Sequence, residues 1–128
     1  MIGKARMSGF TKAHRPDSFI RVRIASVNAI GPGKADLLEA IAETGSVSAA
    51  SRRLRISYRR SWDLVKSLNG AFRVPLVDLV KGGAKGGGAR LTDTGREVLT
   101  LYRRMESAAE GAIATDLAVF RALLREEE

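Results

Sequence analysis

The stretch from Ser46 to Phe72 limits most strongly how this 128-residue chain can fold, because it holds two helix starts with a very short connection between them. Ser46 and Ser57 each stand immediately before a helix-forming run, where a serine oxygen accepts a hydrogen bond from an unpaired backbone N–H group. One face of the first predicted helix carries its apolar residues, Val47, Ala50 and Leu54. Two helices in such close succession predict a helix-turn-helix.

The second predicted helix, which starts at Tyr58, separates an inward stripe from a charged outward face. At helical spacing, the inward positions are Ser61, Leu64, Val65, Leu68 and Phe72, with Trp62 at the margin. The outward positions are Arg59, Arg60, Asp63, Lys66 and Ser67. A cationic helix about 10–12 Å across fits the major groove of DNA.

Arg59 and Arg60 fall in the first turn of this helix, whose residues reach base edges in a docked helix-turn-helix. Arginine pairs bidentately with O6 and N7 of guanine, at roughly 1–3 kcal/mol of discrimination for each good pair. The sequence therefore predicts that both arginines read bases, while Ser57 and Tyr58 fix the helix at the groove edge. The simpler alternative is two solvated arginines, with Arg59 paired to Asp63.

Basic charge is concentrated in the middle of the chain. The formal net charge is +8 and the calculated pI is about 10.6. Residues 46–91 carry 10 basic and 2 acidic side chains (+8), against 7 and 4 (+3) in residues 1–45 and 5 and 8 (−3) in residues 92–128. This distribution favours double-stranded DNA as the partner. The expected phosphate anchors are Arg52, Arg53, Lys66, Lys85 and Arg90.

The residues before Ser46 predict an arm, a strand and a helix. Residues 1–17 are polar and basic without apolar periodicity and predict a flexible arm before a DNA-binding domain at residues 18–91. Alternation over Phe19–Val27 predicts a half-buried strand. Helical spacing over Lys34–Glu43 predicts a helix that stops at Thr44 and Gly45. Its acidic residues are expected on a solvated face: Asp36, Glu39 and Glu43.

The residues after Phe72 predict a basic hairpin. Val74–Val80 is short and apolar, with Pro75 near its start, which is typical of an edge strand. The run KGGAKGGGAR at residues 81–90 predicts a flexible wing that places Lys85 and Arg90 over the sugar-phosphate backbone or in the adjacent minor groove. Its glycine spacing matches neither nucleotide-binding pattern, G-x-x-x-x-G-K-[ST] or G-x-G-x-x-G. A simple solvated loop is the alternative.

Residues 92–128 predict one long C-terminal helix, from Thr92 to Leu124, with Thr92 or Asp93 as its cap. Apolar positions recur along it in steps of three and four. Because such a helix outruns a small domain, its distal stripe would be exposed in a monomer, so we expect a homodimer. A break near Gly111, with the helix folding back, is the alternative.

Several other classes of function lack the residues that they need. The chain has no cysteine, which is compatible with a reducing cytosol, and we expect a cytoplasmic protein. The single histidine, His14, has no companions for a metal site, and no nucleophile and base can be paired, so we expect no enzyme, no cofactor and no metal. No apolar stretch approaches the ~20 residues that span a bilayer, so neither a membrane partner nor an export signal is expected.

Three linked motifs resemble the N-terminal DNA-binding domain of the ModE family of molybdate-responsive transcriptional regulators and, more distantly, LysR-type winged helices. They are Glu43–Ala50, Ser57–Trp62 and the run KGGAKGGGARLTDTGR. The resemblance covers residues 19–105 and implies a mainly α fold with a small β wing, a winged helix-turn-helix with a long C-terminal dimerisation helix. The dimer would form through helices 34–43 and 92–124. The resemblance also implies that DNA is faced by Ser46, Ser48, Ser57, Tyr58, Arg59 and Arg60, with Lys85 and Arg90 on the wing.

This sequence departs from the family pattern at two places. Arg55 stands where the turn commonly has a glycine, so a positive φ there would carry local strain. Family members continue into an oxyanion-binding module, whereas this sequence ends soon after the long helix, so no molybdate site is expected. The expected function is sequence-specific regulation of transcription at an inverted repeat. The alternatives are a non-specific architectural DNA-binding dimer and a winged helix that docks another protein.

Overall fold

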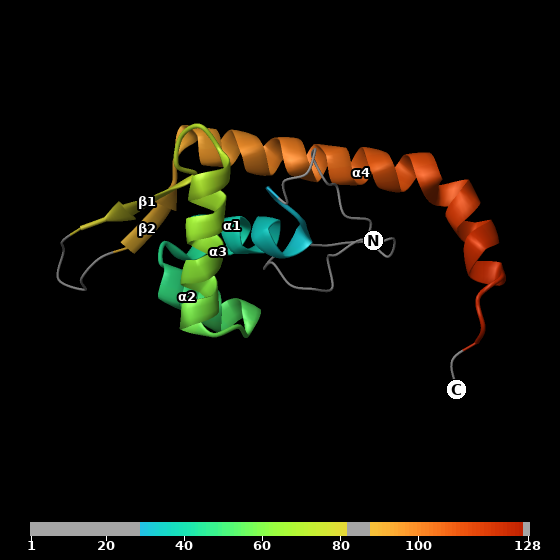
Figure 1. The fold of residues 1–128 in the computed structure, drawn as a ribbon, viewed down its shortest axis with the longest axis horizontal. Coiled ribbons are helices and arrows are strands. Elements are labelled where there is room, and N and C mark those ends of the chain that lie inside the picture. The colour runs from blue at the N-terminus through green and yellow to red at the C-terminus, as the bar shows by residue number, and fades with distance from the viewer. Residues whose placement is uncertain (1–28, 82–87, 127–128) are drawn as a thin grey trace.

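A computed structural model describes residues 29–81 and 88–126, which form a helical head, a hairpin and one long helix (Figure 1). The elements are α1 (Pro32–Thr44), α2 (Val47–Leu54), α3 (Tyr58–Ala71), β1 (Val77–Val80), β2 (Gly88–Leu91) and α4 (Asp93–Ala122). This order confirms the predicted winged helix-turn-helix with a long C-terminal helix. The predicted arm at 1–17, the predicted strand at 19–27 and Lys85 lie outside the described residues.

The starts of α2, α3 and α4 and the end of α1 fall where the sequence predicts them, whereas α1 starts at Pro32, before the predicted Lys34, and α4 ends at Ala122, before the predicted Leu124. Three hydroxyl side chains cap helices by accepting a hydrogen bond at 2.9 Å from the backbone N–H three residues later: Ser46 before α2, Ser57 before α3 and Thr92 before α4. Helix α1 stops at Gly45, which has a left-handed φ of 80°.

The turn between α2 and α3 places Arg55 in the left-handed region, with φ 60° and ψ 42°. This conformation costs an L-residue with a Cβ atom roughly 1–2 kcal/mol, so the strain expected at this position is present. Backbone hydrogen bonds hold the turn, because the N–H of Arg55 donates to Arg52 at 3.3 Å and that of Ile56 donates to Ser51 at 3.1 Å. The helix-turn-helix therefore forms without a glycine at its turn.

One apolar core lies between the three helices of the head, the hairpin and the start of α4. Its fully buried large side chains include Leu37, Leu38, Ile41, Leu68, Leu76 and Tyr102. The inward positions predicted for α2 and α3 are buried or half-buried, and the outward ones are exposed, as the periodicity predicts. Within the core the Ser51 and Ser61 hydroxyl oxygens lie 2.7 Å apart, so a buried hydroxyl pair joins α2 to α3.

Strands β1 and β2 pair antiparallel, from Val77 opposite Leu91 to Val80 opposite Gly88. The first strand begins later than predicted because the Asn69 side chain accepts the backbone N–H groups of Leu76 and Val77, at 2.8 and 3.1 Å.

The hairpin is also fastened to the corner between α1 and α2. The N–H of Ala89 donates to the carbonyl oxygen of Gly45 at 2.8 Å. A Cβ atom at position 88 would lie 2.8 Å from that same oxygen, so this close approach requires Gly88. The base of the wing is thus held at a fixed place beside the helix-turn-helix.

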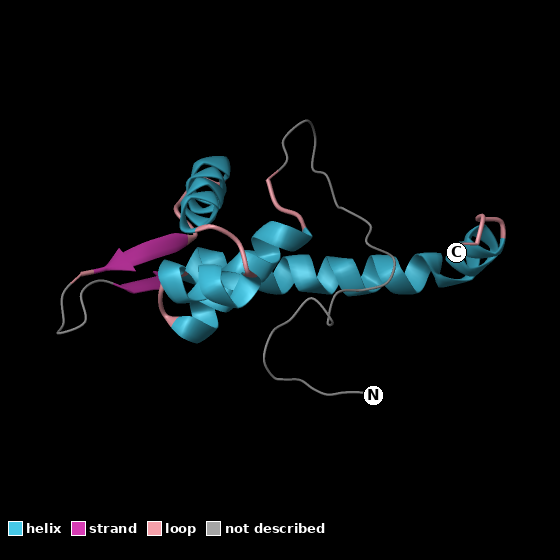
Figure 2. Cartoon of the chain, turned by 90° about the horizontal axis from the view of Figure 1, so that it is seen from below, coloured by secondary structure: helices cyan, strands magenta, loops and turns pink. Residues whose placement is uncertain are grey.

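Helix α4 continues through Gly111 to Ala122, so the alternative with a break at this glycine is wrong. Figures 1 and 2 show that α4 passes along α1 and then extends well beyond the other helices, away from the hairpin. Its proximal part buries Gly95 and Tyr102. Its distal part and the two residues that follow it leave large apolar side chains exposed, namely Val119 (61%), Phe120 (58%), Leu123 (80%) and Leu124 (57%).

The solvated acidic face expected on α1 is wrong for Asp36 and Glu39. Asp36 is only 5% exposed and Glu39 is half-buried. Arg103 of α4 lies 3.0 Å from the Asp36 carboxylate and 3.1 Å from that of Glu39, and Glu106 is a further partner at 3.1 Å. We call these four residues the α1–α4 seam. They are brought together because α4 lies against this face of α1, a contact between residues far apart in the sequence.

Candidate nucleic-acid interface

The first turn of α3 presents Tyr58, Arg59 and Arg60 to solvent, as predicted for residues that read bases. Within residues 29–81 and 88–126, no ion pair joins Arg59 to Asp63 or Arg60 to any carboxylate. The structure therefore lacks the Arg59–Asp63 pair of the simpler alternative, but both arginines are solvated, as that alternative also expects. Both guanidinium groups project from a helix start that Ser57 fixes by its cap.

Lys34 of α1 lies near Arg60, and the sequence pattern did not predict it as part of the site. Its ammonium group donates to the Ser67 hydroxyl on α3 at 2.8 Å. Burial and then the nearby charge of Arg60 lower the pKa of Lys34. No spacing rule links positions 34 and 60, so only the packing of α1 on α3 brings them together. We call the exposed basic surface of Lys34, Arg59, Arg60 and Lys66 the cationic face.

The predicted anchors on α2 are exposed but engaged with neighbouring side chains. Arg52 donates to the Ser48 hydroxyl at 2.8 Å, which ties together two residues predicted to face DNA. Arg53 lies 2.6 Å from the Glu43 carboxylate. Arg53 must therefore exchange this carboxylate for a phosphate if it is to anchor DNA.

The hairpin divides its side chains between two faces. Leu79 and Ala89 are register partners on the face toward the helix-turn-helix, whereas Asp78 and Arg90 are partners on the opposite face. Arg90 is exposed, as expected for a phosphate anchor, but the structure does not bring it next to Arg59 and Arg60.

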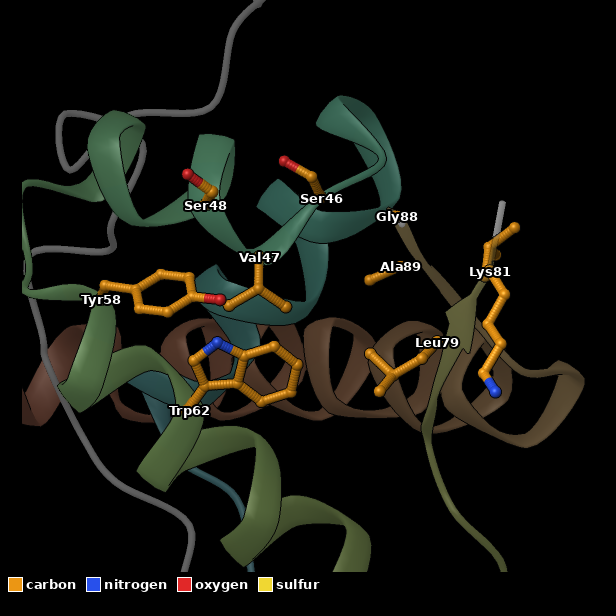
Figure 3. Close-up of a pocket in the computed structure, with 10 residues that line it drawn as sticks. Ser46, Val47, Ser48, Tyr58, Trp62, Leu79, Lys81, Gly88 and Ala89 are labelled. Carbon is orange, nitrogen blue, oxygen red and sulfur yellow. The ribbon is translucent and has the colours of Figure 1, made fainter. Parts of the chain in front are cut away.

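A groove of about 500 Å³ separates the start of α3 from the hairpin (Figure 3). We call it the wing groove. It is lined by Ser46, Val47, Ser48, Tyr58, Trp62, Leu79, Val80, Lys81, Gly88 and Ala89. The Tyr58 and Trp62 rings meet edge to face, with centroids 6.0 Å apart and an interplanar angle of 81°. Lys81 is the one charged residue in the described part of this lining, so the groove combines an apolar surface with positive charge.

The described part of the chain holds neither a metal site nor a membrane-spanning helix. In residues 29–81 and 88–126 no group of three or more histidine, cysteine or acidic side chains is arranged to hold a metal ion. None of the helices in these residues has both the length and the apolar character required to cross a bilayer. The groove and the exposed basic residues around it are thus the surface that we consider for binding.

Comparison with known families agrees with this geometry. Residues 34–96 match the family of bacterial regulatory helix-turn-helix proteins of the lysR type. The matched residues run from the first turn of α1 to the first turn of α4. Because this is a family of DNA-binding regulators, it agrees with the prediction that the chain is not an enzyme.

Several curated proteins are similar to part of the chain. The molybdenum-pterin-binding protein MopA of Rhodobacter capsulatus is 38% identical over 84 residues, which are 66% of this chain and 32% of that protein. The molybdenum transport protein ModE of Azotobacter vinelandii is 40% identical over 77 residues, 60% of this chain and 28% of its own length. The DNA-binding transcriptional dual regulator ModE of Escherichia coli is 38% identical over 71 residues, 56% and 27% of the two chains.

The chain thus spans about a third or less of each of these relatives. The similarity is confined to their N-terminal region, where the helix-turn-helix lies. The chain therefore carries a DNA-binding domain of the ModE family, built on the LysR-type helix-turn-helix.

Proposed function

We propose that this protein is a cytoplasmic homodimer that binds an inverted repeat in duplex DNA and regulates transcription. The observation that carries the proposal is the start of α3, where Arg59 and Arg60 are exposed beside Lys34 and have no carboxylate partner among the described residues. Cations that repel one another in the unbound protein gain most from an anionic partner. The DNA-binding relatives support the same assignment.

Each part of the surface has a distinct role in this proposal. Arg59 and Arg60 read base edges, while Ser57 and Tyr58 position α3 at the groove edge. Phosphates are anchored by Arg52, Arg53, Lys66, Lys85 and Arg90, with Ser46 and Ser48 beside them. Residues 1–17 act as a flexible basic arm, residues 18–91 form the DNA-binding domain, and residues 92–128 form the dimerisation helix.

The dimer assignment rests on the distal part of α4 and the residues that directly follow it. Phe120, Leu123 and Leu124 are more than half exposed, which is unfavourable for a helix that stays in water. A second copy can cover them, and a two-fold axis would then present two α3 helices to DNA. The corresponding half-sites lie about one helical turn apart.

The proposal is tested by selection from random duplexes at about 150 mM salt, with a random duplex as competitor. We expect an inverted repeat bound roughly 10³-fold or more above background. An enriched pool without any preferred sequence would leave a non-specific architectural protein. An absence of DNA binding would favour docking of another protein.

Base readout is tested separately with alanine variants. Arg59→Ala or Arg60→Ala should cost roughly 1–3 kcal/mol on the selected site and relax one base preference. Lys66→Ala and Lys85→Ala are the matched controls, because loss of a phosphate contact weakens all sequences alike. If Arg59→Ala lowers the affinity for selected and random duplexes equally, the readout assignment is wrong.

A further inference from the structure

The wing groove is an open channel between the start of α3 and the hairpin. Figure 3 shows Ser48 and Tyr58 at one end and Leu79 and Lys81 at the other, with Val47 and Trp62 between them. The middle is thus apolar and partly aromatic, and the ends carry hydroxyl groups or an ammonium group. Among the residues that the structure describes, no carboxylate lines it.

The position of the groove indicates what can enter it. If α3 lies in the major groove of DNA and the wing reaches the neighbouring minor groove, one sugar-phosphate strand must pass between them, because a single strand separates adjacent grooves of a duplex. The space between α3 and the hairpin is the wing groove. This step rests on DNA binding through α3 and the wing, and not on base readout by the arginines.

The chemistry of the lining matches such a strand. A deoxyribose presents mainly C–H groups, which pack on apolar and aromatic surface, and it is flanked by two anionic phosphates. Trp62 and Leu79 supply the apolar surface, while Ser48 and Lys81 stand on opposite sides of it (Figure 3).

Exposure of the lining favours a passing strand over a small molecule. Leu79 is 63% exposed, Tyr58 56% and Val80 40%. Small-molecule sites are concave and enclose most of their ligand. A continuous strand covers both rims of an open groove at once.

We propose that the wing groove seats one deoxyribose of the DNA backbone, packed on Trp62 and Leu79, with Ser48 and Lys81 contacting its two flanking phosphates. The contact is independent of base sequence. This proposal rests on the proposed function and extends it. Contact with the backbone in the wing groove would fix how deeply α3 enters the major groove.

The test compares Leu79→Glu with the control Val74→Glu. Val74 is 45% exposed and Leu79 is 63% exposed, and Val74 does not line the groove, so the control adds the same charge outside it. We expect Leu79→Glu to weaken binding by about tenfold or more, by the same factor for a selected and a random duplex, and Val74→Glu by about twofold or less. Lys81→Gln should make the salt dependence shallower by about one counterion. Circular dichroism establishes that each variant is folded.

Trp62 is the single tryptophan of the chain and reports directly on the groove. DNA should shift its emission to shorter wavelength in the wild type. Hydroxyl-radical cleavage should show, in each half-site, one protected deoxyribose that becomes cleavable in Leu79→Glu.

Equal affinity of Leu79→Glu and Val74→Glu, with an unchanged Trp62 spectrum on bound DNA, would overturn the seat while leaving DNA binding intact. Wild-type protein that binds no duplex would overturn the proposed function together with the seat. The two failures are therefore distinguishable.

Discussion

Arg60 on the cationic face and Arg103 in the α1–α4 seam show two uses of the same side chain. Arg60 is exposed and its charged neighbour is Lys34, another cation. Arg103 is packed between helices and contacts the carboxylates of Asp36, Glu39 and Glu106. An arginine surrounded by carboxylates holds two helices together, whereas an arginine beside a lysine remains available for an anion outside the chain.

The electrostatics of the seam follow from its partial burial. Burial disfavours the charge on Arg103, but the hydrogen bond to Asp36 and the charges of Glu39 and Glu106 raise its pKa above the usual range. Burial raises the pKa of Glu39, and the charge of Arg103 and its hydrogen bond lower it by less. Arg103 therefore does not fully offset the burial of Glu39, whose pKa is also raised by the charges of Glu43 and Asp36.

The largest effect is expected when the seam loses its cation. Arg103→Ala leaves the buried Asp36 and half-buried Glu39 without this guanidinium and should lower the free energy of unfolding by about 3 kcal/mol. Urea denaturation measures the change. Arg104→Ala, at an exposed neighbouring position, should change it by less than about 0.5 kcal/mol. A cost for Arg60→Ala as large as that for Arg103→Ala would break the comparison.

The buried hydroxyl pair tests how the cationic face is held in place. Ser51→Ala and Ser61→Ala should each cost about 1 kcal/mol, because each removes the bond between the two hydroxyls while the remaining hydroxyl keeps its bond to the backbone carbonyl of Val47 or Ser57. The double variant should cost clearly less than the sum, since it removes both groups. Urea denaturation of the four proteins of this cycle measures the coupling, with exposed Ser107→Ala as a neutral control. Strict additivity would show that the pair does not couple α2 to α3.

A smaller effect, on DNA affinity, is expected at Arg53, which is exposed like Arg60 but paired with a carboxylate like Arg103. Arg53 faces DNA by prediction but is paired with Glu43, and both side chains are about one-third or more exposed, 35% and 45%. Glu43→Gln should free Arg53 for a phosphate and improve binding to a random duplex by roughly 0.2–1 kcal/mol. The salt dependence should steepen by about 0.9. Glu97→Gln removes the same charge from an exposed position on α4 and should change neither the affinity nor the salt dependence. If both variants changed binding equally, the cause would be the net charge and not the release of Arg53.

The smallest effect concerns the pH dependence of the seam. Since the pKa of Glu39 is raised above 4.5, the folded chain binds this proton more readily than the unfolded chain. Its contribution to stability is present below that pH and is lost as the pH rises through the raised value. The free energy of unfolding of the wild type minus that of Glu39→Gln should therefore fall as the pH rises above about 4.5. A difference that rises with pH would contradict this sign.

The sequence alone determined the local parts of this protein. The caps at Ser46, Ser57 and Thr92, the stop at Gly45 and the inward and outward faces of α2 and α3 depend on residues within one or two helical turns. Periodicity and capping report such short-range interactions directly. The three motifs of the ModE resemblance also lie in continuous stretches, so the family was predictable. The base-reading roles of Arg59 and Arg60 stay a prediction.

Only the tertiary structure decided which distant residues meet. Asp36 was expected in solvent and lies against Arg103, whereas Lys34 was not considered and lies beside Arg60. Lys81 reaches the wing groove, and Arg90 points to the other face of the hairpin. These outcomes depend on where α4 crosses α1 and on how closely Gly88 lets the wing approach Gly45. Such contacts are set by packing between elements, and a periodic pattern within one element carries no information about its neighbour in space.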